Sequence, residues 1–242
     1  MKSSNYIDFA IKKLELLKET QSEVIDKAAS YVAQSCMQGG YFYIFGSGHS
    51  HMIAEEIYLR AGGLALVKAI LPGEVMLHEM ANKSTLLERL DGYASALLTL
   101  YKLEAKDTLV VISNSGRNPL PVEMALEAKK IGCKVIGITS MKHTQAQSSR
   151  HKSGKNMYEY CDLVIDNLTP IGDAEYEVEG LDSPTGSSSS ITGITIIQAL
   201  VTTAIDKMIQ NGYQPPVFKS SNVDGGDEHN DKLFEKYYSY NK

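Results

Sequence analysis

The fold of this chain is decided by the stretch Leu109-Val110-Val111-Ile112-Ser113-Asn114-Ser115-Gly116-Arg117-Asn118-Pro119. Its first four residues are apolar and three of them are β-branched, which predicts a strand buried on both faces of a parallel sheet. Asn118 is suited to the N-cap of a helix and Pro119 to its first turn, where a missing N–H costs nothing. The stretch therefore predicts the strand–turn–helix unit of an α/β protein.

The turn between this strand and this helix is rich in hydrogen-bond donors. Ser113, Asn114 and Ser115 carry hydroxyl and amide groups, and the backbone N–H groups of the turn lie at the positive end of the helix. Such an arrangement binds anions, most often phosphate. A serine-rich turn that merely caps its helix has the same composition, so the turn alone leaves both interpretations open.

The chain contains this arrangement twice. Residues 41–45 form another buried-strand pattern, followed by Gly46-Ser47-Gly48-His49-Ser50 and a second helical pattern. A glycine turn after a strand also suggests a dinucleotide-binding fold, but His51 stands where the third glycine of that motif belongs. The next predicted strand, 64–70, ends in Leu71-Pro72-Gly73 without the acidic residue that would bind a ribose. Dinucleotide binding is therefore disfavoured.

Strand and helix patterns alternate along the core of the chain, with further strands predicted at 134–139 and 163–166. This alternation predicts the α/β class, as a three-layer αβα sandwich around a five-stranded parallel sheet with right-handed crossovers. Ligands of such sheets bind beyond the carboxyl ends of the strands, where the strand order reverses. Both serine turns follow strands directly, so they are expected to lie at that edge and to contact one small ligand.

Three regions are expected. Residues 1–40 form a helical segment, in which Thr20 and Glu23 suggest a capping box and a break. Residues 41–212 form the α/β domain. The tail, 213–242, is polar and glycine-rich but ends in aromatic residues, so it is expected to be ordered and to close over the site. The amphipathic first segment is expected to pack against a second subunit, in a homodimer or homotetramer.

Composition excludes several classes of function. A net charge of −5 and an isoelectric point near 5.7 argue against nucleic acid as a partner. No apolar run is long enough to span a bilayer, and no signal-peptide pattern is present, so no membrane association is expected. The three cysteines are far apart, which predicts free buried thiols and a cytoplasmic location. No histidine, cysteine or carboxylate spacing demands a metal, and no cofactor is expected.

The two turns, in this order after a helical segment, resemble those of the SIS (sugar isomerase) domain family. The resemblance covers about residues 5–210 and implies a phosphosugar-binding domain of flavodoxin-like topology. It implies that a phosphorylated sugar is the ligand. The residues that it places at the phosphate are Ser50, Ser113 and Ser115, with Ser47, Gly48 and Asn114 close by and Asn118 where a hydroxyl is usual.

Within the family, the segment Gly46 to Glu56 is similar to phosphoheptose isomerases. Thr185-Gly186-Ser187-Ser188 and Gly193 are similar to N-acetylmuramic acid 6-phosphate etherases. Arg60-Ala61-Gly62-Gly63 and the segment 222–230 are most like a less characterised branch of the family.

Isomerisation and elimination both require a base beside a carbonyl and an acid that serves an oxygen. The resemblance places Arg60 where the isomerases have their catalytic glutamate, so Glu56, one turn earlier, is one candidate base, although it can instead pair with Arg60. Glu88 is a second candidate, because the etherases have an acidic residue in the corresponding helix. His229 is the candidate acid or second base, since histidine titrates near neutral pH.

Four other residues are expected to contact the sugar: His51, Ser187, Ser188 and Asn222. The serine run at 187–190 is equally typical of a linker with an N-cap. The chain is thus predicted to be a sugar-phosphate isomerase of the aldose–ketose type. The alternatives are a regulatory module that binds a phosphosugar without turnover, and an etherase or lyase acting on an amino-sugar phosphate.

Overall fold

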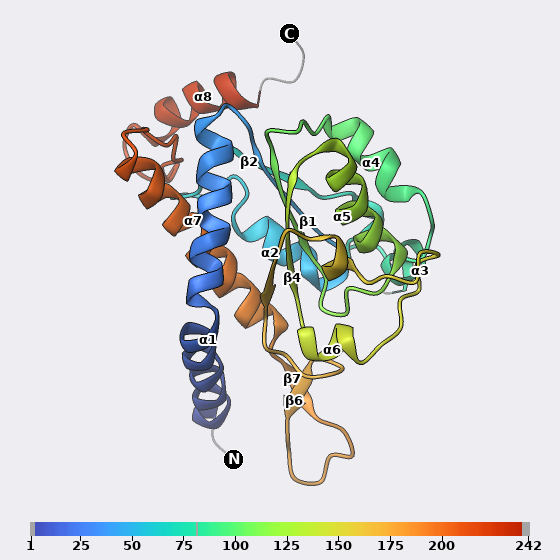
Figure 1. Cartoon of the computed structure of the whole chain (residues 1–242). Helices are drawn as coiled ribbons and strands as arrows, with labels where there is room; N and C mark the ends of the chain where they lie inside the picture. The colour runs from blue at the N-terminus through green and yellow to red at the C-terminus, as the bar shows by residue number, and fades with distance from the viewer. Residues whose placement is uncertain (1–2, 81, 239–242) are drawn as a thin grey trace.

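The computed structural model describes residues 3–80 and 82–238. Its centre is a parallel sheet of five strands in the order β2-β1-β3-β4-β5 (Figure 1). The strand bounds are β1 Phe42–Gly46, β2 Val67–Ile70, β3 Thr108–Ile112, β4 Lys134–Thr139 and β5 Leu163–Asp166. The predicted α/β sandwich and its five parallel strands are confirmed.

Helices cover both faces of this sheet, and three single turns of 3₁₀-helix connect elements. The helix bounds are α1 Ser3–Met37, α2 His51–Glu56, α3 Lys83–Leu87, α4 Tyr93–Tyr101, α5 Pro119–Ile131, α6 Met141–Gln145, α7 Ser189–Gln210 and α8 Gly226–Tyr237, and the 3₁₀ turns are η1 Gly48–Ser50, η2 Gly73–Val75 and η3 Met157–Tyr160. Helices α1, α2 and α7 pack on one face, and α4 and α5 on the other. The sheet is therefore buried on both sides.

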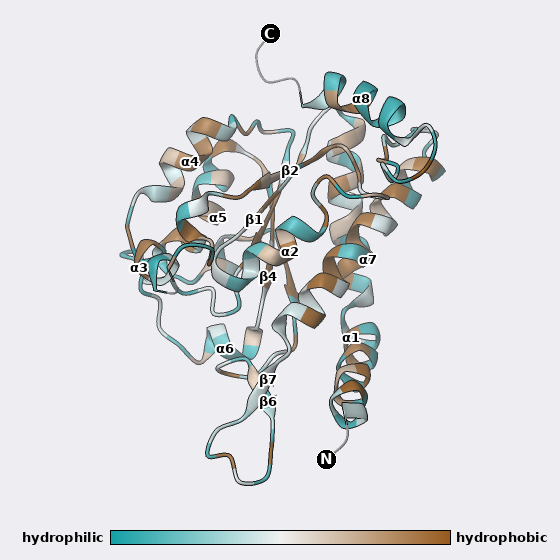
Figure 2. Ribbon diagram, turned by 180° about the vertical axis from the view of Figure 1, so that it is seen from behind, coloured by the Kyte–Doolittle hydropathy of each residue, from teal (hydrophilic) through white to brown (hydrophobic). Residues whose placement is uncertain are grey.

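Side chains of the central strands alternate between two apolar cores. In β1, Phe42 and Ile44 belong to the core under α1 and α7, whereas Tyr43 and Phe45 belong to the core under α4 and α5. Figure 2 shows the strands as the apolar centre of the molecule. Burial on both faces explains why the strands read as continuous apolar runs rather than as alternating patterns.

Helix α1 is a single helix of 35 residues. The break expected near Thr20 is absent from this described helix, because the Thr20 hydroxyl donates to the Leu16 carbonyl (2.8 Å) inside the helix instead of capping a new one. Between β2 and β3, the described residues form η2, α3 and α4. Gly92, with a φ of +83°, separates α4 from the preceding turn.

Helix α7 is long and apolar enough by composition to cross a membrane, which the search for apolar runs did not predict. A core helix of a globular protein meets the same criterion. α7 packs along α1, and Ile196, Ile197 and Leu200 lie in the core between the helices and the sheet. Its apolar character is therefore explained by packing within this chain.

An antiparallel hairpin, β6 (Ala174–Tyr176) and β7 (Thr185–Ser187), projects from the molecule near α6 (Figure 1). Because α6 follows β4 directly, this is the edge formed by the carboxyl ends of the strands. The ring of Tyr176 packs edge-on against Tyr6 of α1, with ring centroids 5.5 Å apart. The hairpin thereby joins the start of α7 to the start of α1.

The tail packs at the opposite end of the strands, where α8 lies in Figure 1. Lys68 Nζ donates to the Tyr237 carbonyl, and the Tyr238 hydroxyl donates to the Val67 carbonyl (2.5 Å). Val67 and Lys68 begin β2, so α8 lies at the amino ends of the strands. Up to residue 238 the tail is ordered, as predicted, but within one chain it does not close over the serine loops. Residues 239–242 lie outside the described part.

Candidate functional site

The sheet brings the two serine loops side by side. Gly46 at the end of β1 pairs with Ile112 at the end of β3, so Ser47 and Ser113 follow on neighbouring parallel strands. Neighbouring strands lie about 4.8 Å apart. The strand order reverses between β1 and β3, and this is the position where ligands bind in open α/β sheets.

The loop after β1 is a tight turn that requires glycine. A Cβ atom on Gly46 would collide with the Ser50 carbonyl group, and Gly48 has a φ of +55°. The Ser50 N–H donates to the Ser47 carbonyl (3.0 Å), and the ring Nδ1 of buried His51 bonds to the Gly48 carbonyl. The loop therefore has a fixed shape, and the first turn of α2 begins directly behind it.

The loop after β3 is held from within and from β5. Ser113 Oγ accepts the Gly116 N–H (3.2 Å), and Gly116 has a φ of +58°. The side-chain oxygen of Asn114 accepts bonds from Asn167 Nδ2 (2.8 Å) and Thr169 Oγ1 (2.7 Å). Asn114 therefore anchors the loop to the segment after β5, while Ser115 remains half-buried beside it.

Glu88 links the two loops. Ser47 Oγ donates to one carboxylate oxygen of Glu88, and Asn118 Nδ2 donates to the other (2.7 Å). Asn118 has the extended backbone of an N-cap, as predicted, but its side chain makes no cap hydrogen bond. A half-buried carboxylate thus faces both loops at the point where the strand order reverses.

Arg150 lies near this carboxylate. Arg150 Nη1 donates to Asn118 Oδ1 (2.9 Å). Partial burial lowers the pKa of Arg150, the charges of Arg117 and Arg89 lower it further, and Glu88 opposes the shift. Positive charge therefore gathers beside the loops. No sequence motif marks these arginines; the signal is their proximity once the chain is folded.

Glu56, the first candidate base, faces away from the loops. Its carboxylate forms an ion pair with Arg60 and accepts a hydrogen bond from Gln198 Nε2 of α7 (2.9 Å). This ion pair with Arg60, four residues later, is the alternative to a role as base that the sequence left open. The structure thus brings only Glu88, of the two glutamates, to both loops.

The tail residues are also remote from the loops. His229 Nε2 bonds to the Val217 carbonyl (2.9 Å) within the tail, and Asn222 is exposed in the turn before α8. Both belong to the segment that packs at the amino ends of the strands. The expectation that they line the site does not hold within one chain.

Ser187 and Ser188 lie at the start of α7, on the same edge of the sheet as the loops. The hydroxyl of buried Ser188 donates to Glu175 of the hairpin (2.8 Å), and the Ser187 carbonyl accepts a bond from the Tyr6 hydroxyl (3.4 Å). Their known contacts therefore serve the hairpin and α1.

Two side-chain groups among the described residues have the composition of a metal site, which the sequence analysis did not expect. Their members are His51, Glu55 and His78 in one group and Asp91, Glu123 and His151 in the other, with the ligand atoms of each group within 4.8 Å of one another. In the first group only His51 is buried.

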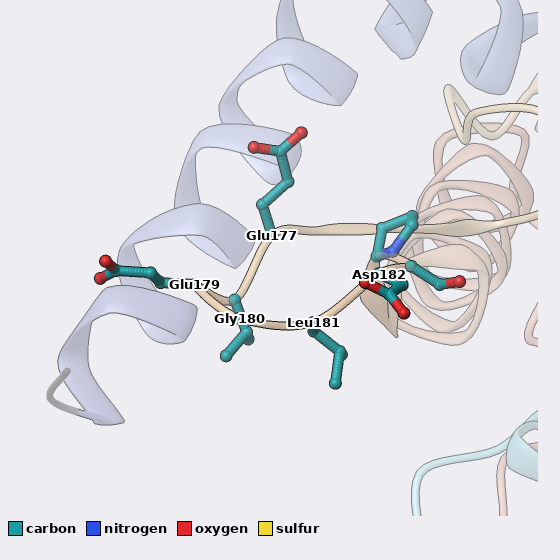
Figure 3. A pocket seen from close by; sticks show the side chains of 8 residues that line it. Glu177, Glu179, Gly180, Leu181 and Asp182 are labelled. Atoms are coloured by element: carbon teal, nitrogen blue, oxygen red, sulfur yellow. The ribbon is translucent and has the colours of Figure 1, made fainter.

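A separate pocket is formed by the tip of the hairpin, residues 177–184 (Figure 3). The side chains of Glu177, Glu179 and Asp182 point away from one another in this view. An acidic surface repels phosphate, and diverging carboxylates do not form a common ligand site. This pocket is therefore no candidate for anion binding.

Comparisons with known proteins agree with this fold. A family model described as SIS domain matches residues 5–140. A UPF0309 protein of Halalkalibacterium halodurans is 53% identical over 237 residues, which cover 98% of each chain. A UPF0309 protein of Listeria innocua serovar 6a is 41% identical, over 97% of this chain and 95% of the relative.

Two solved structures share the fold. Phosphoheptose isomerase GmhA from Neisseria gonorrhoeae has a TM-score of 0.53 at 18% identity, over 84% of this chain and 96% of that one. The sugar isomerase domain of the RpiR transcription factor from Sphaerobacter thermophilus has a TM-score of 0.50 at 12% identity, over 97% and 96% of the two chains. At these identities the likeness concerns the fold alone.

Proposed function

The chain belongs to the SIS domain family, together with its UPF0309 relatives, and from this premise we propose that its two serine loops bind the phosphate group of a sugar phosphate. The observation that carries the proposal is the meeting of both loops at the reversal of strand order, joined by Glu88. Hydroxyl donors, oriented backbone N–H groups and helix N-termini together favour an oxyanion.

The phosphate and the Glu88 carboxylate are both negative, so they compete for the same hydrogen-bond donors. Ser47 and Asn118 already bond to Glu88. We therefore assign the phosphate to Ser50, Ser113 and Ser115, deeper between the loops. Arg150 and Arg117 offset the added negative charge, because a positive charge nearby strengthens hydrogen bonds to phosphate.

We assign the role of base to Glu88 and the reaction to aldose–ketose isomerisation. The carboxylate takes the proton from the carbon beside the sugar carbonyl, while the carbonyl oxygen gains a proton and an enediol forms. Return of the proton to the neighbouring carbon, with loss of the proton from the other oxygen, completes the reaction without any external oxidant. Ser47 and Asn118 fix the orientation of the base, and a positioned base contributes about 10²- to 10⁴-fold in rate.

A binding module without turnover is the second candidate. The observation in its favour is that Glu88 already bonds to both loops, which a purely structural link would also do. An elimination reaction would use the same base and would release a group from the neighbouring carbon.

The sugar phosphate is tested with the full chain and a panel of sugar phosphates and their unphosphorylated parents. Binding to the folded state raises the melting temperature by mass action, so only phosphorylated sugars are expected to raise it. Ser113→Ala and Ser115→Ala should weaken binding about 10- to 100-fold, because hydrogen bonds to charged groups contribute about 1.5–3 kcal/mol. A panel that leaves the melting temperature unchanged contradicts the proposal.

Turnover is tested by nuclear magnetic resonance in deuterated water. Wild-type protein should exchange the carbon-bound proton of the best-binding sugar phosphate, and Glu88→Gln should bind the sugar but lose exchange by about 10²-fold or more. Binding without exchange in the wild-type protein would favour the module that acts without turnover. Formation of an unsaturated product would favour elimination.

Assembly and location extend this proposal. Exposed apolar residues Ile7 and Ile11 on α1 support a homodimer or homotetramer in which α1 contacts a second subunit. Cys36, Cys133 and Cys161 are free thiols, in keeping with a cytoplasmic protein. Sedimentation analysis of wild-type protein and of Ile7→Glu tests the assembly.

A further inference from the structure

Three residues that are far apart in the chain, Asp91, Glu123 and His151, lie close together in the fold. Asp91 lies in the turn before α4, Glu123 lies in α5, and His151 lies between α6 and η3. Their ligand atoms are within 4.8 Å of one another. Glu123 and His151 are each only 5% exposed, and Asp91 lies at the solvent-exposed side of the group.

His151 presents one ring nitrogen that protein groups leave unsatisfied. Its Nδ1 lies 2.8 Å from Ser153 Oγ, but Nε2 is buried and has no hydrogen-bond partner among the described residues. The nearest carboxylate oxygen, Glu123 Oε1, is 3.6 Å away, which is longer than a hydrogen bond. A buried nitrogen without a hydrogen-bond partner destabilises the folded state unless a bound group beside it provides an interaction.

The distance of 3.6 Å between His151 Nε2 and Glu123 Oε1 suits two ligands of one bound metal ion. Zinc lies about 2.0–2.2 Å from imidazole and carboxylate ligands, and two such ligands in tetrahedral arrangement are roughly 3.4 Å apart. The Ser153 N–H also approaches Nδ1, at 3.3 Å, and donates to it when that nitrogen is unprotonated. In the tautomer that carries the ring proton on Nδ1, Nδ1–H donates to Ser153 Oγ and the Nε2 lone pair faces Glu123, and this is the tautomer that a metal ion at Nε2 requires. A hydrogen bond through the far ring nitrogen is the usual support of a metal-binding histidine.

Hydrogen bonds also fix the orientation of the Glu123 carboxylate. Both of its carboxylate oxygens accept the Gly92 N–H, at 2.9 and 2.7 Å. A carboxylate has about four lone-pair sites, so this single donor leaves others free toward His151. The same bond holds Asp91, the residue before Gly92, beside Glu123. Two carboxylates this close repel each other, and a cation between them relieves the repulsion.

We propose that Asp91, Glu123 and His151 bind a divalent transition-metal ion of the zinc class, with a fourth position open to water. One imidazole and two carboxylates suit such an ion. The ion ties the segment before α4 and the loop containing His151 to α5. It thereby holds Arg150 against Asn118, the residue directly before α5, and holds the turn that follows Glu88.

The test measures zinc binding and requires no sugar. The group of His51, Glu55 and His78 could bind zinc as well, so His51→Gln is introduced first. Chelator-stripped His51→Gln protein is titrated with zinc by calorimetry, and its metal content is measured by mass spectrometry after dialysis. One ion per chain is expected. Glu123→Gln and His151→Gln in this background should each weaken binding about 100-fold or more, since even supporting residues of metal sites contribute 10- to 100-fold.

If the Glu123→Gln or His151→Gln protein does not fold, Asp91→Asn still tests the proposal, because Asp91 is exposed. It should weaken zinc binding at least about 10-fold while the circular dichroism spectrum is unchanged. Exposed Asp231 of α8 provides the matched control, and Asp231→Asn should bind zinc as the parent does. The proposal is overturned if the His51→Gln protein binds no zinc, or if folded Asp91→Asn binds it as tightly as its parent.

Discussion

The side-chain amide of Asn118 donates a 2.7 Å hydrogen bond to the carboxylate of Glu88, thirty positions earlier in the chain. The Leu120 N–H also donates to the Glu88 carbonyl (3.0 Å). Glu88 thus attaches the end of α3 to the start of α5 twice, once through its side chain and once through its backbone carbonyl. This attachment brings a carboxylate to the loop that follows β3.

Asn118→Asp should break this attachment. The substitution removes the amide donor and places a second carboxylate against Glu88, so the free energy of unfolding should fall by about 1–3 kcal/mol. Urea unfolding measures the change. Asn222→Asp, in the exposed turn before α8, is the control and should change it by less than about 0.5 kcal/mol. Equal effects of the two substitutions would contradict the link.

Glu56→Gln should have little effect on the proposed reaction. The Glu56 carboxylate is held by Arg60 and Gln198 rather than by the loops, so deuterium exchange should stay within about threefold of wild type. A loss of about 10²-fold or more, the size expected for a base, would assign the role of base to Glu56 instead of Glu88.

Gly46→Ala should destabilise the loop after β1. The added methyl group would meet the Ser50 carbonyl, which is backbone and cannot rotate away. Crowding of this kind typically costs about 1–3 kcal/mol. Gly73→Ala is the control, since nothing lies within 4 Å of the Cβ position there. Thermal unfolding of both variants checks the difference, and similar melting temperatures would show that the loop is not tight.

Lys68 should make stability depend on alkaline pH. Burial lowers the pKa of Lys68 to about 8 from an ordinary value of 10.5. Between these values the unfolded chain holds a proton that the folded chain has released, so the contribution of Lys68 to the free energy of unfolding rises with pH. Across pH 8 to 10.5 wild type should therefore gain stability relative to Lys68→Met.

Unfolding by urea at several pH values measures this difference. The exposed residue Lys232 of α8 provides the control, and Lys232→Met should follow wild type across the range. A difference between wild type and Lys68→Met that stays constant with pH would contradict the lowered pKa.

The sequence predicts those strands, turns and helices that depend on residues close together in the chain. The β-branched run at 109–112, the extended Asn118 and Pro119 in the first helical turn are local signals, and each strand, turn and helix that they predict is present. The identity of the ligand-facing carboxylate is not local. Glu88 approaches the loops only because β3 returns beside β1, which no pattern around Glu88 shows.

The same limit applies to the tail and to Arg150. The aromatic residues of the tail correctly predict an ordered segment, but their composition does not say which edge of the sheet they contact; Tyr238 bonds to the start of β2. Arg150 belongs to a polar stretch typical of a surface loop, and its contact with Asn118 spans 32 residues. Such contacts depend on the order of the strands rather than on local preference.

The thiols of Cys36 and Cys133 should resist alkylation in the folded protein. Burial, together with the nearby Asp107 carboxylate, raises the pKa of each thiol to about 12. The thiolate is the reactive form, so very little of it exists at pH 8, and the side chains are 1% and 2% exposed. Iodoacetamide followed by peptide mass spectrometry should find both residues unmodified under native conditions and fully modified in urea. Complete modification of Cys36 in the folded protein within minutes would mean that α1 separates from the sheet on that timescale.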